Sequence, residues 1–236
     1  MSGRRVGILG GTFDPIHCGH LDVADAAANT LALTSVFMIP SNIPPHRPQP
    51  FASAYHRFAM VALAVAERPA WRAVDLELRS TTPSYTSSTL GHLRNRGYAP
   101  NELFFIIGAD AFGEIATWHD YPAILDAAHF VVVSRPGSPV TALAQRLPHL
   151  VARMITAISA IAPASPSIIL IDAPTADVSS TAIRQTLGEG TAIDGMVPAG
   201  VRQHIEQHGL YIPGTPGRRA SDGLYPIAAG RLHGED

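Results

Sequence analysis

The residues best suited to chemistry lie in one short segment, residues 10–20, which reads GGTFDPIHCGH. An apolar run, Val6–Leu9, precedes it and a helix-like segment, Leu21–Leu33, follows, so the segment is predicted to join a buried strand to a helix. At such a junction glycine lets the backbone approach a ligand closely, and the helix start offers unpaired N–H groups and a positive dipole end. His17 and His20, three residues apart, add protonatable donors on one face. The segment therefore predicts a phosphate-binding turn.

Three other readings of this segment are weaker. The histidines could be core residues beside a helix cap, although two glycines, an Asp-Pro pair and two histidines in one turn favour a site. His-x-x-His can chelate zinc, but it has neither cysteine partners nor a carboxylate at helical spacing here. A dinucleotide fingerprint, Gly-x-Gly-x-x-Gly, does not fit the frame, which argues against a nicotinamide-dependent dehydrogenase.

A second candidate anion site begins at Ser179, Ser180 and Thr181. Hydroxyl residues in a row normally cap a helix, and that role alone would be structural. Here they follow a strand-like run, Ile168–Ile171, and precede Arg184, whose planar guanidinium suits phosphate oxygens. We predict that this turn and residues 10–20 face each other and hold one polyphosphate.

Composition excludes several classes of mechanism. All 17 Lys and Arg residues are arginine, so Schiff-base chemistry and the Gly-Lys phosphate loop are ruled out. The net charge of −2 gives no basic field for nucleic acid. There is no apolar run of ~20 residues to span a membrane and no signal-peptide pattern. Cys18, the only cysteine, cannot form an internal disulfide, which favours a cytoplasmic protein; its place at a helix start could lower its pKa.

Strand-like and helix-like segments alternate along the chain, which predicts an α/β fold: a Rossmann-like, doubly wound, mainly parallel sheet with helices on both faces. A single domain is expected over residues 1–212, with a mobile tail at 213–236 and a proline-rich loop at Ile39–Phe51. The predicted strands are Val6–Leu9, Val36–Ile39, Val74–Leu78, Leu103–Ile107, Phe130–Val133 and Ile168–Ile171. The predicted helices are Leu21–Leu33, Ala54–Ala66, Thr86–Arg96, Ala123–Ala127, Val140–Leu150, Ser180–Leu187 and Gly200–His208.

The two motifs, GGTFDPIHCGH at 10–20 and SSTAIR at 179–184, resemble the nucleotidyltransferase superfamily that carries a His-x-Gly-His signature. Further segments resemble its bacterial nicotinate-nucleotide adenylyltransferases. They are NIPPHR at 42–47, PSYT at 83–86, GAD at 108–110, Trp118 and RPG at 135–137. The resemblance covers about residues 5–212 in consistent order. It implies transfer of the adenylyl group of ATP to nicotinate mononucleotide, with release of pyrophosphate.

The resemblance also implies roles for single residues on the ATP side. His17 and His20, as imidazolium donors, would contact the phosphates and stabilise the transferring α-phosphoryl group, and Arg184 would hold the β and γ phosphates. Asp110 would face a ribose, although it could instead cap the following helix. The catalytic residues implied are His17, His20 and Arg184. The ATP-binding residues implied are Gly10, Gly11, Thr12, Phe13, Gly19, Gly108, Asp110, Arg135, Ser179, Ser180 and Thr181.

On the acceptor side, Thr86 and Trp118 would receive the nicotinate ring, and the proline-rich loop would close over the mononucleotide phosphate. The residues implied are Asn42, His46, Arg47, Tyr85, Thr86 and Trp118. Arg47 stands where many relatives have lysine, which keeps the charge but changes the geometry. Trp118 and Tyr85 could instead be packing residues, and His46 could order the loop without touching substrate.

We expect Mg²⁺ to be carried by the ATP phosphates and water, without a dedicated protein metal site. The expected partners are ATP and nicotinate mononucleotide, with a homo-oligomer possible and no nucleic acid or membrane. The alternatives are another adenylyl- or cytidylyltransferase of the superfamily, using phosphopantetheine or nicotinamide mononucleotide as acceptor, and a non-catalytic nucleotide-binding sensor.

Overall fold

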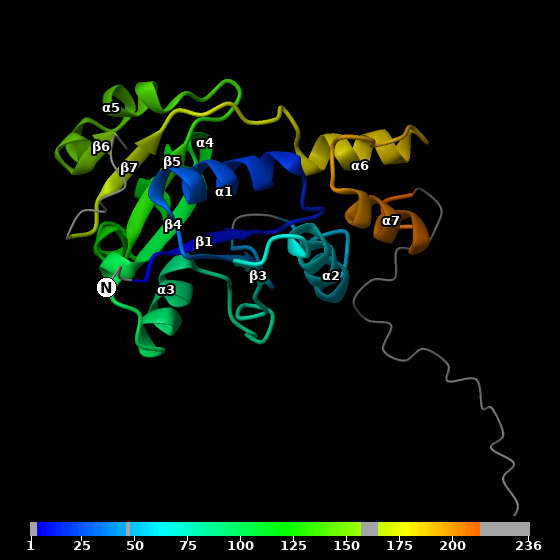
Figure 1. Cartoon of the computed structure of the whole chain (residues 1–236), viewed down its shortest axis with the longest axis horizontal. Coiled ribbons are helices and arrows are strands. Elements are labelled where there is room, and N and C mark those ends of the chain that lie inside the picture. The colour runs from blue at the N-terminus through cyan, green and yellow to red at the C-terminus, as the bar shows by residue number, and fades with distance from the viewer. Residues whose placement is uncertain (1–3, 46–47, 157–164, 213–236) are drawn as a thin grey trace, which may run out of the picture.

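The computed structural model describes residues 4–45, 48–156 and 165–212 (Figure 1). Within these residues a seven-stranded, all-parallel sheet has the strand order β3-β2-β1-β4-β5-β7-β6. The strands are β1 (Val6–Gly11), β2 (Ser35–Pro40), β3 (Trp71–Ala73), β4 (Leu103–Gly108), β5 (His129–Val133), β6 (Met154–Thr156) and β7 (Ile168–Ile171). The predicted Rossmann-like α/β fold is confirmed. The predicted tail at 213–236 and two predicted site residues, His46 and Arg47, lie outside the described residues.

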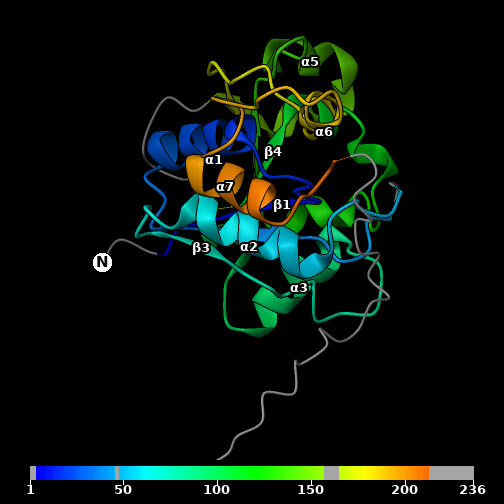
Figure 2. The same cartoon turned by 90° about the vertical axis from the view of Figure 1, so that its right-hand side faces the viewer.

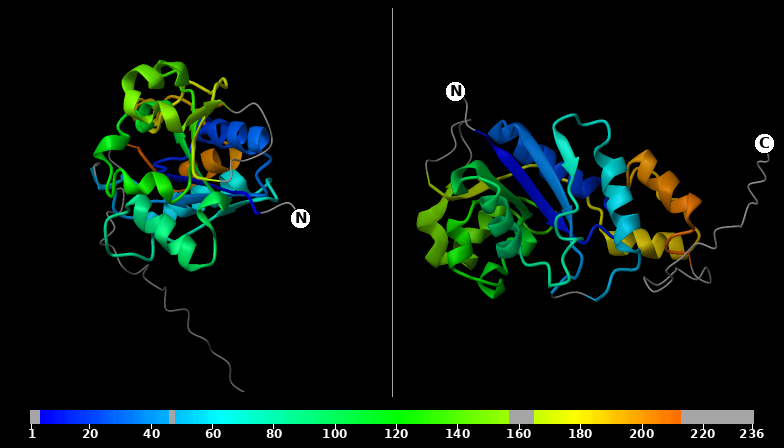
Figure 3. Two further views of the ribbon diagram at one scale, coloured as in Figure 1. Left: turned by 90° about the vertical axis from the view of Figure 1, so that its left-hand side faces the viewer. Right: turned by 90° about the horizontal axis from the view of Figure 1, so that it is seen from below.

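Helices cover both faces of the sheet. The α-helices are α1 (Cys18–Leu31), α2 (Ala54–Val65), α3 (Thr86–Asn95), α4 (Ala109–Phe112), α5 (Leu143–Arg146), α6 (Ser180–Gly188) and α7 (Ala199–Gln207). One core contains buried residues of α1, α2, α6 and α7, and the other contains residues of α3, α4 and α5. Figure 3 shows these layers from two further sides, and Figure 2 shows α2 beside α7. No helix among the described residues is long and apolar enough to cross a membrane.

The central strands β1, β4 and β5 are almost entirely apolar because both sheet faces are covered; the exception is His129, which begins β5. In β4, Phe104 and Ile106 belong to one core, whereas Phe105 and Ile107 belong to the other. Successive side chains of a strand point to opposite faces, so this alternation follows directly from strand geometry. Because its side chains are buried on both faces, the sheet is a rigid support for the loops at its carboxyl edge.

Three sequence predictions of elements need correction. The predicted strand Val74–Leu78 is wrong: the pairing with β2 is made by Trp71–Ala73, and the chain turns away afterwards, placing Glu77 against Thr89. The short edge strand β6 was not predicted. The predicted helix Val140–Leu150 breaks into a 3₁₀ turn, the short α5 and a second 3₁₀ turn at Pro148–Arg153, because proline at 148 cannot continue the helix.

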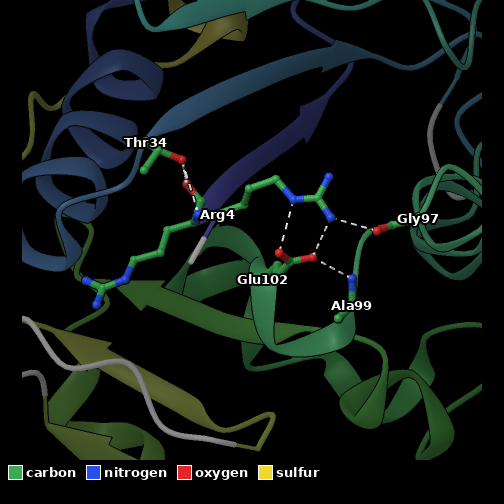
Figure 4. Close-up of polar contacts among 6 residues, drawn as sticks. Arg4, Thr34, Gly97, Ala99 and Glu102 are labelled. Atoms are coloured by element: carbon green, nitrogen blue, oxygen red, sulfur yellow. Dashed lines mark hydrogen bonds and ion pairs between the residues drawn. The ribbon is translucent and has the colours of Figure 1, made fainter. Parts of the chain in front are cut away.

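Arg4 lies just before β1 and links it to the segment before β4, at the end of the sheet opposite the two predicted phosphate motifs (Figure 4). Its Nε and Nη2 donate to the two carboxylate oxygens of Glu102 at 3.0 Å each, and Nη2 also donates to Gly97 O at 2.7 Å. The same carboxylate accepts the Ala99 amide at 2.8 Å. On the other side, Thr34 exchanges hydrogen bonds with the backbone of residue 5. These contacts are exposed, so their value lies in positioning more than in stability.

A buried histidine predicts how stability depends on pH. His129 is 0% exposed, stacks on Phe104 with ring centroids 4.7 Å apart, and burial lowers its pKa from 6.5 to about 4. Between these values the unfolded chain binds more protons than the folded one, so stability falls as the pH drops from 6.5 towards 4. We expect a loss of about 2 kcal/mol from this group between pH 7 and pH 5.

Denaturant unfolding of the wild type and of His129→Gln at both pH values measures this contribution. The variant should lose about 2 kcal/mol less than the wild type over that interval. An identical loss in both proteins would show that His129 titrates normally in the folded state.

Candidate active site

The candidate site lies where the strand order of the sheet reverses. β1 and β4 are neighbours in the sheet, and the chain crosses over in opposite directions from them, which creates a crevice at the carboxyl ends of open α/β sheets. Gly10 and Gly11 end β1 and Gly108 ends β4, so the predicted glycines lie on this edge. Thr12 and Phe13 follow β1 directly, and Phe13 has a left-handed φ of 50° that turns the chain towards α1.

The two signature histidines lie together at the start of α1. The helix begins at Cys18, three residues earlier than predicted, so that His17 is its N-cap and His20 lies in its first turn. Their ring centroids are 3.7 Å apart, and the His17 amide donates to His20 Nδ1 at 3.3 Å. Phe13 packs edge-on against His20 at 5.0 Å. The helix start thus holds both imidazoles as one unit.

His17 is neutral at physiological pH in the ligand-free protein. It is buried, and burial followed by the nearby positive charge of Arg135 lowers its pKa from 6.5 to about 4. The imidazolium form expected in the complex with ATP stays a prediction for His17. Its Nδ1 is buried and has no hydrogen-bond partner among the described residues. An anion beside this nitrogen would favour the protonated form and supply the missing partner.

The second motif contacts the first, as predicted. Ser180 Oγ donates to Pro15 O at 2.8 Å, and Arg184 Nη1 donates to Asp14 O at 2.7 Å. Figure 1 shows the start of α6 beside the start of α1. Ser179 is the N-cap of α6 and accepts the Ala182 amide at 3.1 Å, so its side chain closes the helix start.

The remaining side chains of this turn are accessible. Thr181 is exposed and its Oγ1 accepts from Arg184 Nη2 at 3.3 Å. The Arg184 guanidinium lies over the Phe51 ring at 4.7 Å, which holds it at the end of the proline-rich loop. A helix start, two hydroxyl residues and a permanent cation thus converge on the turn that precedes α1.

Arg135, in the loop that follows β5, contacts both motifs. Its Nη1 donates to Gly19 O at 3.0 Å and its Nη2 to Val178 O at 3.2 Å. A Cβ at Gly19 would lie 2.8 Å from Arg135 Nη1 and 3.1 Å from the backbone oxygen of Ala176, so a side chain there would displace the guanidinium and crowd this backbone. The glycine of the His-x-Gly-His signature is therefore explained by close packing against the segment that leads to α6.

The β4 end of the site is equally crowded. A Cβ at Gly108 would lie 2.5 Å from Asp110 Oδ1 and 2.9 Å from Arg135 Cγ, which brings Gly108, Asp110 and Arg135 together. Asp110 is exposed in the first turn of the short α4. Beside this group, a hollow of about 430 Å³ opens between the loops after β5 and β7. Its lining is Ser134, Arg135, Pro136, Gly137, Pro139, Asp172, Ala173, Pro174 and Thr175.

The predicted acceptor residues lie around the start of α3. Thr86 is the first residue of α3, and its N-cap Tyr85 makes no side-chain cap. Tyr85 stacks on His119 with centroids 4.3 Å apart. Asn42 ties the proline-rich loop to this region through a 2.7 Å hydrogen bond from its Nδ2 to Ser80 O. Trp118 is half-buried against the second core, edge-on to a phenylalanine of β4, so it has a packing role as well.

Two residues that hold the turn between β1 and α1 in place, Asp14 and Arg57, were not predicted from the sequence. Asp14 is buried, and its carboxylate accepts the amides of Phe51 and Ala52 at 2.7 and 3.0 Å and the Tyr211 hydroxyl at 2.8 Å. Arg57, 1% exposed, donates from Nη1 to Thr12 O at 2.8 Å and to Ser41 O at 2.6 Å. Burial lowers the pKa of Arg57, but the Asp14 charge opposes that shift. The sequence has no local signal for this role of Arg57, because its burial results from packing between segments far apart in the chain.

The structure also bears on the pKa of Cys18 and on the alternative of zinc binding by His17 and His20. Burial and the nearby Asp22 raise the pKa of the Cys18 thiol, so the prediction that its position lowers the pKa is wrong. Within the described part of the chain, three potential metal ligands come together only at His56, His204 and His208, which leaves out both signature histidines. The geometry at His17 and His20 therefore favours an anion over a metal.

Comparison with known proteins agrees with this geometry. The cytidylyltransferase-like family model matches residues 8–186. A protein of Klebsiella pneumoniae subsp. pneumoniae named "Probable nicotinate-nucleotide adenylyltransferase" is 41% identical over 206 residues, covering 86% of this chain and 95% of its own. A relative of the same name from Cronobacter sakazakii is 43% identical over 212 residues, covering 86% of this chain and 94% of its own.

Solved structures share the fold. The Plasmodium falciparum nicotinic acid mononucleotide adenylyltransferase complexed with NaAD superposes with a TM-score of 0.67 at 17% identity, over 89% of this chain and 98% of that one. The same enzyme complexed with APC gives a TM-score of 0.66. Identity of about 40% with the bacterial relatives over most of both sequences goes further than fold alone. The chain belongs to the nicotinate-nucleotide adenylyltransferase family, within the cytidylyltransferase-like proteins.

Proposed function

We propose that this protein transfers the adenylyl group of ATP to nicotinate mononucleotide, forming nicotinate adenine dinucleotide and pyrophosphate. The observation that carries the proposal is the docking of α6 on the turn before α1, through Ser180 and Arg184. This contact brings the two signature motifs together, which supports a shared surface for the phosphates. Family membership then selects the substrates.

The reaction needs little covalent help from the protein. A phosphate oxygen of the mononucleotide attacks the α-phosphorus of ATP, and the bond from that phosphorus to the bridging oxygen of the β-phosphate breaks. The nucleophile is already anionic, so no side chain has to be deprotonated. The barrier is mainly electrostatic, because two polyanions meet and charge builds on the α-phosphoryl and pyrophosphate oxygens.

The proposed catalytic residues would stabilise this negative charge. His17 and His20 would donate to the α-phosphoryl oxygens from the start of α1, where the helix dipole adds to them. Arg184, with Ser180 and Thr181, would hold the β and γ phosphates. Mg²⁺ would enter with ATP, bound to phosphate oxygens and water, as its preference for hard oxygen ligands suggests.

The other residues proposed to contact ATP lie at the carboxyl edge of the sheet or in the loops beside it. The turn residues Gly10, Gly11, Thr12 and Phe13 would let the phosphates approach the backbone closely. Asp110 would bind a ribose hydroxyl, and Gly108, Gly19, Arg135 and Ser179 would shape the surface around it. Acceptor binding would fall to the loop and α3 residues Asn42, His46, Arg47, Tyr85, Thr86 and Trp118.

Two rival functions are less well supported. A nucleotide sensor without activity would not require the buried, unpartnered Nδ1 of His17 beside a helix start. A different acceptor, such as phosphopantetheine, would have no use for the uncapped start of α3 beside the Tyr85–His119 stack. We also propose a cytoplasmic location, because the sole cysteine, Cys18, suits a reducing compartment.

Pyrophosphate release from ATP and Mg²⁺ with a panel of acceptors tests the proposal. Nicotinate mononucleotide should give turnover on the order of 1–10³ s⁻¹, as for typical enzymes. Phosphopantetheine in place of it, or CTP in place of ATP, should give none above background. Release with phosphopantetheine alone would move the protein to another branch of the family, and silence with every acceptor would favour a sensor.

A further inference from the structure

Three histidines outside the proposed active site form a cluster between α2 and α7. His56 lies in the first turn of α2, His204 lies in α7, and His208 follows the last residue of α7. One ring nitrogen from each can be chosen so that all three lie within 4.8 Å of one another. His56 Nδ1 and His204 Nε2 form a 3.1 Å hydrogen bond, which a metal ion bound to both nitrogens would replace.

The rings converge on one another instead of packing into the core. Ring centroids are 5.2 Å apart for His56 and His204, 4.8 Å for His56 and His208, and 4.4 Å for His204 and His208. His56 and His204 are half-buried and His208 is exposed, so an ion could enter from solvent. The spacing of four residues between His204 and His208 puts both on one face of the helix.

The chemistry of this donor set selects a class of metal. Neutral imidazole is a good ligand for zinc, copper, nickel and cobalt, whereas Mg²⁺ and Ca²⁺ prefer oxygen. Tetrahedral zinc with Zn–N of about 2.1 Å requires nitrogens roughly 3.4 Å apart, which the His56–His204 pair nearly meets. To reach tetrahedral geometry, the exposed His208 ring would have to move closer to the other two nitrogens.

We propose that His56, His204 and His208 bind one late first-row divalent cation, with Zn²⁺ as its physiological occupant and water as the fourth ligand. The ion clamps α2 to α7. His56 precedes Arg57, which holds the phosphate turn, and α7 leads to Tyr211, whose hydroxyl binds Asp14. The clamp therefore joins the two elements that support the active-site turn from outside it.

The test uses the full chain after removal of metal by chelation and dialysis. Zn²⁺ affinity is measured by competition with a chromophoric chelator, and Co²⁺ is used as a probe because tetrahedral Co²⁺ absorbs strongly in the visible range. The variants are His208→Gln, which removes an exposed ligand, and His56→Gln/His204→Gln/His208→Gln. His149→Gln is the matched control, because His149 is an exposed histidine that contacts Tyr121 on another part of the surface.

We expect the wild type and His149→Gln to bind one equivalent of Zn²⁺ and to give the tetrahedral Co²⁺ spectrum. His208→Gln should lower Zn²⁺ affinity by at least about tenfold, and the triple variant should lose the site. Zn²⁺ at 100 times its Kd should raise the Tm of the wild type by roughly 5–10 °C and leave the triple variant unchanged. Equal Zn²⁺ affinity in the wild type and His208→Gln, or no stoichiometric binding by the wild type, would overturn the proposal. His208→Gln keeps the test decisive even if the triple variant does not fold.

Discussion

Replacing His17 or His20 by alanine is expected to lower kcat by about 10²–10⁴-fold while the protein remains folded. Both imidazoles lie at the start of α1, with ring centroids 3.7 Å apart. Their donors would meet charge that develops on the α-phosphoryl group only in the transition state, so their loss affects kcat more than KM. Pyrophosphate release under saturating ATP and nicotinate mononucleotide measures the effect.

His149→Ala is the matched control, since it removes an exposed imidazole far along the chain from the signature and should keep the wild-type rate. Circular dichroism establishes that each variant is folded. A purified His17→Ala protein with near-normal turnover would remove His17 from the catalytic residues, and the same holds for His20. An increase in KM alone, without loss of kcat, would assign the residue to ground-state binding.

The order of elements and the contact between the two phosphate motifs could be predicted from sequence because both depend on local patterns. Continuous apolar runs identify buried parallel strands, and turn residues at the strand ends mark the carboxyl edge. Five of the six predicted strands, those other than Val74–Leu78, overlap observed strands. The site follows from the same logic, since Ser180 and Arg184 begin a helix after β7 and meet the turn after β1.

What could not be predicted depends on contacts between segments far apart in the chain. Asp14 and Tyr211 are 197 positions apart, and no local pattern pairs a turn carboxylate with a hydroxyl after the last helix. The same is true of Arg57, whose burial is visible only once the turn and β2 are packed around it. The low pKa of His17 depends on its burial and on the charge of Arg135 lying close to it, and the motifs show neither the burial nor this proximity. The prediction of a strand at Val74–Leu78 was wrong because Val74 and Leu76 pack against the second core from a loop and turn.

The acceptor site gives the second large expected effect: kcat/KM for nicotinate mononucleotide should exceed that for nicotinamide mononucleotide by about 10²–10⁴-fold. The two acceptors differ by a carboxylate against a neutral amide. Thr86 begins α3, its N-cap Tyr85 supplies no side-chain acceptor, and the first turn holds no acidic residue. The unpaired N–H groups and positive dipole end of this helix therefore favour an anion, whereas the NH₂ of the amide would face donors without an acceptor.

A negative charge introduced at the start of α3 tests whether this helix start causes the preference, because it should change the ratio of the two kcat/KM values and not only lower both. Ser87→Asp adds a carboxylate to the first turn of α3, so it should reduce the preference for the nicotinate form by repelling its carboxylate and satisfying the same donors. Gln203→Asp adds the same charge at an exposed position of α7 and should leave the ratio unchanged. If the wild type prefers the amide, the helix start does not read the carboxylate. If Ser87→Asp lowers both kcat/KM values equally, discrimination arises elsewhere, because a charge acting on the distinguishing group must change the ratio.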